Sequence, residues 1–314
     1  MPGDLFIRSA RWKVAVVSAG LHILFSLRAG PSIRVVFNHA ASIGVRQKLE
    51  RECMQSQLET MFERMGARVR VRETFRRNRG GIDIRSDKRG EYFDIGVEAI
   101  DRVEYEVIDI RPRLKHLLLM ARRDNGKQKF LCGHDERHWF VCAVPGESVS
   151  NVVSAIEALQ PSEVRAAVGR KVKRTKDRLR RRNEAFVRQG EWFFVPAPEL
   201  SVNPKLVLRN EPISRGRGGK PHMCQFLYRT GGELVYVCSR HPRGMLAGEY
   251  AALLNSNPNA RNWNWSRMTR DALAYVRGRV WHPDHKTVVL DDWHRVLMNT
   301  ENQAPGATAV VFLD

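Results

Sequence analysis

The chain has 314 residues, 43% of them hydrophobic, so it can bury a sizeable core and is expected to form about two domains. Its 53 Lys and Arg outnumber its 34 Asp and Glu, which gives a formal net charge of +19. This composition excludes a disordered chain. The excess of positive charge predicts DNA or RNA as the partner, because their phosphates attract a strongly basic protein, but it identifies no reaction.

The cysteines indicate a reducing compartment. There are 5 of them, an odd count in a chain too large to need disulfide cross-links, so we expect free thiols and a cytoplasmic location. The apolar run from Val14 to Leu27 resembles a signal peptide, but it contains His22 and lacks a cleavage site, so a buried element is favoured. No membrane contact is expected, since a membrane span needs about 18 uninterrupted apolar residues.

The first half of the chain predicts a helix packed on an antiparallel sheet. Residues 1–43 form an N-terminal extension that we assign to no domain, and residues 44–146 form the first domain. Apolar residues recur at helical spacing from Val45 to Met65, and Gly66 ends this helix. A series of short segments rich in β-branched and aromatic residues follows, which indicates strands.

Residues 147–183 predict a helical connector that carries the most basic part of the chain. Pro161 is typical of a helix start, and apolar residues recur at helical spacing from Val164 to Leu179, so we expect one helix through residues 170–182, the basic segment. Its cationic residues are Arg170, Lys171, Lys173, Arg174, Lys176, Arg178, Arg180, Arg181 and Arg182.

Residues 184–314 predict a β-rich C-terminal domain. Gly231-Gly232 favours a tight hairpin turn between strands that run from Gln225 to Val237. Taken together, the elements predict an α+β protein with two lobes of mainly antiparallel sheet, joined by a helical, strongly basic segment.

Four residues around this hairpin have side chains that bind zinc, namely His222, Cys224, Cys238 and His241. A two-residue turn would place His222 opposite His241 but Cys224 opposite Ser239. The four side chains would converge only if the ladder bulged or ended before Cys238. Zinc is therefore one possible cofactor, and the alternative is two buried thiols with two histidines near prolines.

Two further histidine groups are candidates for catalysis. His134, Glu136 and His138 occupy alternate positions and would share one face of an extended strand, although a hairpin loop is the alternative. The second group is a two-histidine, one-carboxylate set of the kind that binds iron, with an ordinary turn as the alternative. Its members are His282, Asp284 and His294.

Two more features indicate contact with nucleic acid. One is a loop rich in Gly and Arg, with Arg215, Arg217 and Lys220 as its cations. The other is the pair Trp263 and Trp265, which alternate on one face in a polar context, as rings that stack on bases do.

The leading interpretation is a nucleic-acid-binding protein without catalytic activity of its own. The first alternative is a metal-dependent enzyme, nuclease-like or another hydrolase, that acts on nucleic acid through its His, Asp and Cys hairpin sites. The second alternative is an interaction module for an acidic protein. Convergence of three histidines or cysteines within coordinating distance would favour the enzyme over the binding protein.

Overall fold

The computed structural model describes most of the chain. Three predictions lie outside the described residues: those for Arg215, for Arg217 and for the N-terminal extension apart from its two strands. The described residues are 12–17, 21–26, 55–74, 81–98, 103–123, 126–146, 148–214 and 220–304. The chain divides into two compact units. The first comprises Met1–His134, Trp139–Val141 and Ser150–Val152, and the second comprises Asp135–His138, Cys142–Val149 and Val153–Asp314.

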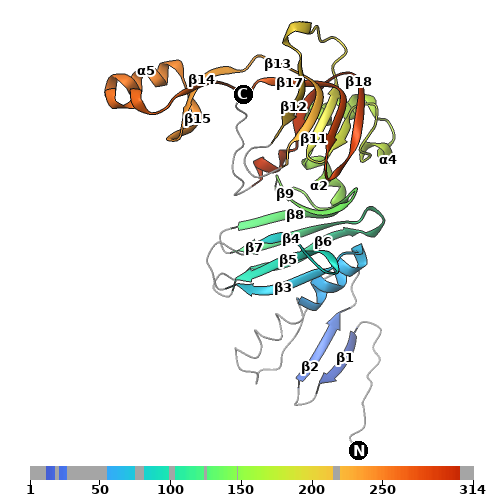
Figure 1. Cartoon of the computed structure of the whole chain (residues 1–314). Helices are drawn as coiled ribbons and strands as arrows, with labels where there is room; N and C mark the ends of the chain where they lie inside the picture. Colours follow the sequence, from blue (N-terminus) through green and yellow to red (C-terminus); the bar gives the residue numbers. More distant parts are fainter. Residues whose placement is uncertain are drawn as a thin grey trace, which may run out of the picture. The chain divides into compact units, whose positions relative to one another are not determined.

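The fold is mixed α+β, with mostly antiparallel sheets and few helices, which confirms the α+β part of the predicted fold class (Figure 1). Among the helices of the described residues, none combines the length and apolar character needed to cross a bilayer. The four cysteines that the structure describes are all free thiols, namely Cys132, Cys142, Cys224 and Cys238.

In its described residues the first unit contains three sheets, one α-helix and one short 3-10 helix. In chain order its elements are β1 (Trp12–Val17), β2 (Leu21–Ser26), a helix over residues 55–65, β3 (Val69–Thr74), β4 (Ile82–Asp87), β5 (Gly90–Glu98), β6 (Glu104–Arg111), η1 (Pro112–Leu114), β7 (His116–Arg123), β8 (Gly126–Asp135) and β9 (His138–Val144). The sheet orders are β1-β2, β3-β5-β4 and β6-β7-β8-β9, and only β3 and β5 pair in parallel. Strands β8 and β9 extend into the second unit at residues 135–138 and 142–144.

The amphipathic helix predicted to end at Met65 is confirmed over residues 55–65. Its apolar face buries Leu58, Phe62 and Met65, and the ring of Phe62 lies 4.8 Å from that of Phe93 on β5. The spacing of these side chains therefore determined which face the helix presents to the core.

The α-helices within residues 148–183 are α2 (Val152–Ala158), α3 (Ser162–Lys171) and α4 (Thr175–Arg178). The prediction of one helix through the basic segment is wrong, because α3 ends at Lys171 and Val172 is extended, with φ −101° and ψ 101°. Val172 is buried against Phe186 and Phe193, so packing of this β-branched residue outweighs the helical pattern around it.

A six-stranded antiparallel sheet forms the core of the second unit. Its elements are β10 (Val187–Gln189), β11 (Trp192–Pro196), η2 (Pro204–Leu206), β12 (Leu208–Ile213), β13 (His222–Thr230), β17 (Leu273–His282), β18 (His285–Met298) and η4 (Thr300–Gln303). The order is β10-β11-β18-β17-β13-β12. Phe194, Leu227, Val276 and Leu290 pack in its core.

Residues 231–272, the inserted module, separate two strands that pair directly. Thr230 at the end of β13 faces Leu273 at the start of β17. Between them lie β14 (Glu233–Cys238), β15 (His241–Leu246), α5 (Ala247–Ser256), η3 (Pro258–Asn262) and β16 (Ser266–Arg270), with sheet order β15-β14-β16. Helix α5 packs against β14 and β15 (Figure 1).

The predicted hairpin from Gln225 to Val237 is therefore wrong. Strand β13 pairs with β12 and β17, whereas β14 pairs with β15 and β16. Gly231 and Gly232 do have positive φ, at +70° and +85°, as a tight turn requires. These glycines redirect the chain into a new sheet, because backbone freedom does not determine which strand becomes the neighbour.

Candidate metal centre

Three histidines lie side by side at one end of the six-stranded sheet. His282 ends β17 and pairs with His285 at the start of β18, across the two-residue turn Pro283-Asp284. His222 begins β13, which pairs with β17 one residue further along, at Met223. Adjacent strands thus bring the three imidazoles together in one compact cluster, which we call the histidine row.

The spacing of the strands sets the spacing of the rings. The ring centroids of His222 and His282 are 4.3 Å apart, and those of His282 and His285 are 4.9 Å apart. Both distances are close to the spacing of about 4.8 Å between neighbouring strands. The centroids of His222 and His285 are only 5.4 Å apart although β17 lies between their strands, so the three rings converge in a triangle. One potential ligand atom from each residue lies within 4.8 Å of the other two.

His222 is the most enclosed member of the row. It is 2% exposed, and neither ring nitrogen has a hydrogen-bond partner among the residues that the structure describes. Burial, with smaller contributions from His282 and His285, lowers the pKa of His222 to about 3. The ring is therefore neutral at physiological pH and keeps a lone pair for a metal ion.

The Nε2 atoms of His285 and His222 face the backbone of Gly190. A Cβ atom at position 190 would lie 2.8 Å from Nε2 of His285 and 3.3 Å from Nε2 of His222. Gly190 follows β10 with φ +57°, a conformation that glycine adopts without strain. A side chain here would collide with both rings, so glycine lets this turn pack closely against two potential ligand atoms.

Gln189 fixes this glycine turn to the strands that carry the histidines. The side chain is fully buried, and its Nε2 donates to the carbonyl oxygens of Val280 at 3.2 Å and Lys286 at 2.7 Å. Those carbonyls belong to β17 and β18, close to His282 and His285. Gln189 therefore positions Gly190 opposite the row.

Neighbouring residues contact His282, which lies on the middle strand of the three. Nε2 of His282 lies 3.2 Å from the carbonyl oxygen of Lys220, and Nδ1 of His282 lies 3.1 Å from the amide nitrogen of Asp284. A neutral ring that donates from Nε2 satisfies both contacts. Nδ1 then carries the lone pair, and a metal ion bound there would replace the hydrogen bond from Asp284.

On the other side, Nδ1 of His285 lies 3.9 Å from a carboxylate oxygen of Glu136. Glu136 accepts from the backbone N–H of Lys286 and forms an ion pair with Arg181, which also pairs with Asp135. If His285 binds metal through Nε2, its Nδ1–H faces a fixed carboxylate. At present Nδ1 of His285 has no hydrogen-bond partner among the described residues. A small shift that brings the carboxylate within hydrogen-bonding distance would orient the imidazole and raise its basicity as a ligand.

The arrangement can hold a divalent transition-metal ion. Zinc–nitrogen bonds of about 2.0–2.1 Å place the ligands of a tetrahedral site about 3.4 Å apart, so the rings need only tilt toward a shared ion. Three protein ligands would leave a coordination position open for water or substrate. A metal ion in this position acidifies bound water and polarises a carbonyl or phosphoryl oxygen.

The four residues of the predicted zinc set lie on two separate sheets. His222 and Cys224 are on β13, whereas Cys238 and His241 face each other across β14 and β15. Burial raises the pKa of Cys224 to about 12, so its thiol stays protonated. The structure thus uses one member of this set, His222, in the histidine row.

The other predicted ligands are also separated. His134 packs its ring edge-on against Trp139, 4.9 Å away, whereas Glu136 lies in a turn with φ +51°. His138 begins β9 and is near enough to Asp284 to contribute to the lowering of its pKa, which a hydrogen bond from Lys220 dominates. The three residues therefore do not share one strand face.

His294 lies far along β18 from the other two members of the predicted iron set. It pairs with Val276 and its Nδ1 contacts the carbonyl oxygen of Asp292 at 2.8 Å. Asp284 instead receives Lys220 Nζ at 3.0 Å. Only His282 of that set belongs to the histidine row.

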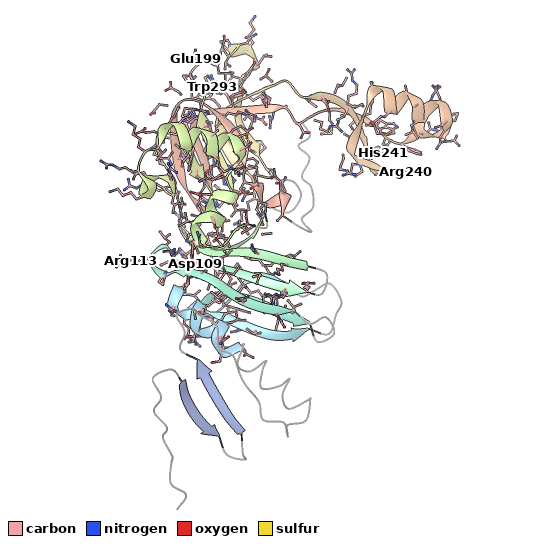
Figure 2. The ribbon with its side chains drawn as sticks, turned by 180° about the vertical axis from the view of Figure 1, so that it is seen from behind. Asp109, Arg113, Glu199, Arg240, His241 and Trp293 are labelled. Carbon is pink, nitrogen blue, oxygen red and sulfur yellow. The ribbon has the colours of Figure 1, made fainter. Side chains whose placement is uncertain are left out.

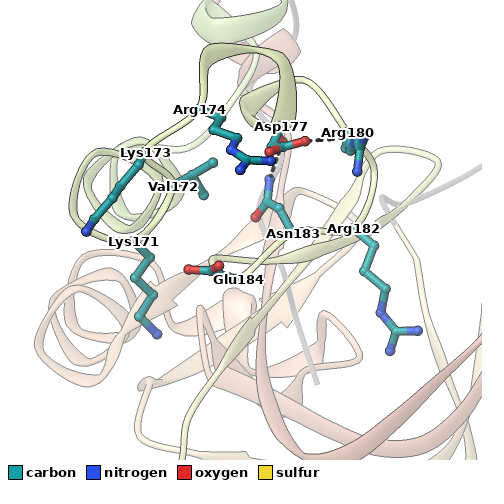
Figure 3. Close-up of a pocket in the computed structure, with 9 residues that line it drawn as sticks. All are labelled: Lys171, Val172, Lys173, Arg174, Asp177, Arg180, Arg182, Asn183 and Glu184. Carbon is teal, nitrogen blue, oxygen red and sulfur yellow. Dashed lines mark hydrogen bonds and ion pairs between the residues drawn. The ribbon is translucent and has the colours of Figure 1, made fainter.

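The basic segment surrounds a pocket of about 550 Å³ (Figure 3). Its cationic lining is Lys171, Lys173, Arg174, Arg180 and Arg182, with Asp177 and Glu184 as the acidic residues. Several cations of the segment have partners, since Arg180 pairs with Asp177 and Arg182 donates to the carbonyl of Val289. Five form no ion pair within the described part of the chain, namely Arg170, Lys171, Lys173, Arg174 and Lys176.

Sequence reasoning did not include His285 in its metal sets, although one signal was available. Pro283-Asp284 forms a two-residue turn, and such a turn places the residues on either side of it, His282 and His285, directly opposite each other. The pairing of β13 with β17 has no comparable local signal, so His222 could not have been added.

Comparisons with protein-family models, with curated proteins and with solved structures found no match to this chain. The geometry defines the class of site: an α+β protein with a three-histidine group that can hold a metal ion.

Proposed function

We propose that this chain is a metal-dependent hydrolase that acts on nucleic acid, with the metal ion bound by the histidine row. One observation carries the proposal: three histidines converge, and the buried member, His222, keeps both ring nitrogens without a hydrogen-bond partner among the described residues. A buried polar group without a partner costs about 1–3 kcal/mol, so a ligand that satisfies it is expected.

The surroundings support catalysis better than a purely structural metal site. Structural zinc sites are closed by four protein ligands, whereas three histidines would leave one position open. At Gly190 a turn without a side chain faces two Nε2 atoms, and we place the open coordination position on this side. A bound metal ion would supply an activated water for attack, and the protein would contribute the fixed ligands.

Nucleic acid as the substrate rests on charge. The chain carries +19, and Arg181 of the basic segment pairs with Glu136 beside His285. One cation of the basic segment, Arg181, thus lies next to the histidine row. Polyanions are the partners that such charge attracts.

Metal binding is the first test. The full chain, purified without added metal and then stripped with EDTA, is expected to bind about one equivalent of zinc or manganese by calorimetry. His285→Ala is expected to abolish this binding, because two histidines hold a metal ion poorly. His294→Ala is the matched control, a histidine on the same strand outside the row, and it is expected to bind as the wild type does. Equal binding by both variants would contradict the metal centre.

Catalysis is the second test, run on the same three proteins. The metal-loaded wild type and the His294→Ala variant are expected to cleave labelled single-stranded or duplex DNA or RNA, whereas the EDTA-treated protein and His285→Ala are not. A protein that binds metal but cleaves none of these substrates would refute the enzymatic part of the proposal.

The second candidate is a nucleic-acid-binding protein without catalytic activity, which the pocket of the basic segment favours. With four or five phosphate contacts, the logarithm of affinity is expected to fall with the logarithm of salt concentration with a slope of about −4. Lys171→Gln with Lys173→Gln is expected to make the slope shallower by about 1.4–1.8. Lys88→Gln with Lys127→Gln removes the same charge elsewhere, and an equal effect would reject a specific role for the pocket.

A further inference from the structure

We infer that the inserted module is a binding site for single-stranded nucleic acid, in which bases stack on the rings of His241, Trp263 and Trp265 beside the guanidinium of Arg240. We call these four residues the aromatic platform. The inference names single-stranded nucleic acid as the substrate class of the proposed hydrolase. It rests on the proposed function only where the bound strand is taken to be the substrate.

The rings of the platform lie nearly parallel. His241 makes interplanar angles of 17° with both Trp263 and Trp265, at centroid distances of 6.1 and 5.6 Å, and the two indoles are inclined by 24°. The guanidinium of Arg240 lies over the Trp263 ring, 4.2 Å from its centre. Parallel rings beside a cation are the arrangement that stacks bases and attracts their phosphates.

These rings do not belong to a hydrophobic core. Each of the three is half-buried, and within the module only Val235, Cys238 and Ala260 are buried apolar residues. Helix α5 buries none of its residues. Large rings gathered where little apolar surface is buried are not explained by folding energy alone.

The two indoles of the platform, Trp263 and Trp265, differ in their hydrogen bonding. The indole N–H of Trp265 donates to the carbonyl oxygen of Ala260 at 2.8 Å, and Tyr250 of α5 packs edge-on against Trp265. The indole N–H of Trp263 has no hydrogen-bond partner among the described residues. Trp265 thus fixes the platform, and we assign the ligand contact to Trp263, whose ring Arg240 flanks from one face.

The charge of the module complements a polyanion. Arg240, Arg243, Arg261 and Arg267 are exposed, and none of them forms an ion pair with any residue that the structure describes. Two acidic residues of the module already have partners, since Glu233 pairs with Arg270 and Glu249 accepts from the backbone N–H of Leu246, the residue before α5. Unpaired guanidinium groups around exposed rings therefore favour a phosphate-bearing ligand over an apolar one.

Single strands fit this surface better than a duplex. Bases of a single strand can unstack and lie on protein rings, whereas those of a duplex are already stacked on one another. Stacking on aromatic rings also tolerates any base, so the expected recognition is independent of sequence.

The test uses the full chain in EDTA, with a labelled single-stranded oligonucleotide of mixed sequence and its duplex form. Trp263→Ala is expected to weaken single-strand affinity about 10-fold or more, because stacking contributes roughly 1–3 kcal/mol per base. Trp263→Phe is expected to keep most of the affinity, and Arg240→Gln to reduce both the affinity and its dependence on salt.

Trp293→Ala is the matched control (Figure 2), since Trp293 is also a half-buried indole with a guanidinium, that of Arg277, 5.2 Å from its ring centre. It is expected to bind as the wild type does. Equal losses in the Trp293 and Trp263 variants, unchanged binding by Trp263→Ala, or concentration-dependent self-association that only Trp263→Ala abolishes would overturn the inference.

The experiment also separates this inference from the metal centre. His285→Ala in EDTA should bind the single strand as the wild type does, and Trp263→Ala should still bind one metal ion. If the wild type fails to bind metal but still binds the single strand, the proposed hydrolase is wrong, whereas the inferred single-strand binding site remains supported.

Discussion

Replacing His222 with leucine is expected to stabilise the metal-free protein at pH 5, by about 1–3 kcal/mol in free energy of unfolding. The imidazole is buried without a hydrogen-bond partner in the described part of the structure, and leucine removes both unpaired nitrogens. Zinc should reverse the order, because saturating metal stabilises the wild type, by about 2.7 kcal/mol at 100 times Kd, and leaves the variant unchanged.

The stabilisation is expected at acid pH because burial lowers the pKa of His222. In the unfolded chain His222 titrates near 6.5, whereas burial holds its pKa at about 3 in the folded protein. Between these values only the unfolded state binds the proton, so stability falls as pH decreases, by up to about 1.4 kcal/mol per unit. The charged and titratable neighbours that face the ring, His282, His285 and Asp284, remain in the variant.

Urea unfolding at pH 5 and pH 7.5, with EDTA or zinc, measures these differences. His294→Leu is the matched control, since His294 is also buried with a lowered pKa but its ring contacts the carbonyl of Asp292. The control is expected to gain less free energy of unfolding at pH 5 than His222→Leu does. Zinc is expected to stabilise the control as it stabilises the wild type. A destabilised His222→Leu at both pH values, or one still stabilised by zinc, would show that the row has another role.

Replacing Gly190 with alanine is expected to weaken metal affinity by about 10- to 100-fold, the range observed when groups that orient ligands are lost. The new Cβ would lie 2.8 Å from Nε2 of His285, so this ring or the turn must move. Calorimetry with zinc measures the change directly. The proposed open side of the metal centre lies here, so catalysis should fall at least as far as affinity.

Gly231→Ala separates the effect of contact from that of backbone strain. Gly231 also has positive φ, at +70°, but a Cβ there meets nothing within 4 Å. This control is expected to lose about 1–2 kcal/mol of stability, the cost of the left-handed conformation for alanine, and to bind zinc normally. If both variants bind zinc as the wild type does, the histidine row does not open toward Gly190.

Periodicity and turn chemistry predicted the local elements well where one face was clearly apolar. The helix over residues 55–65 appeared as expected, because Leu58, Phe62 and Met65 follow the turn of a helix on one side only. The same helical periodicity gave a wrong prediction for the basic segment, where the helix ends at Lys171. Val164 and Val168 continue helically to Val172, but burial of Val172 against Phe186 and Phe193 required an extended backbone that the pattern did not contain.

The sequence by itself determined the α+β class, the strong positive charge, and the pairing of His282 with His285 that a two-residue turn imposes. Only the tertiary structure decided that His222 joins them, that Gly190 faces their nitrogens, and that His241 lies beside Trp263. Turn residues restrict the backbone over a few positions, whereas the choice of a neighbouring strand depends on burial of whole sheet faces. Residue 222 meets residue 282 because β13 and β17 pair across an inserted module, and no local pattern encodes that pairing.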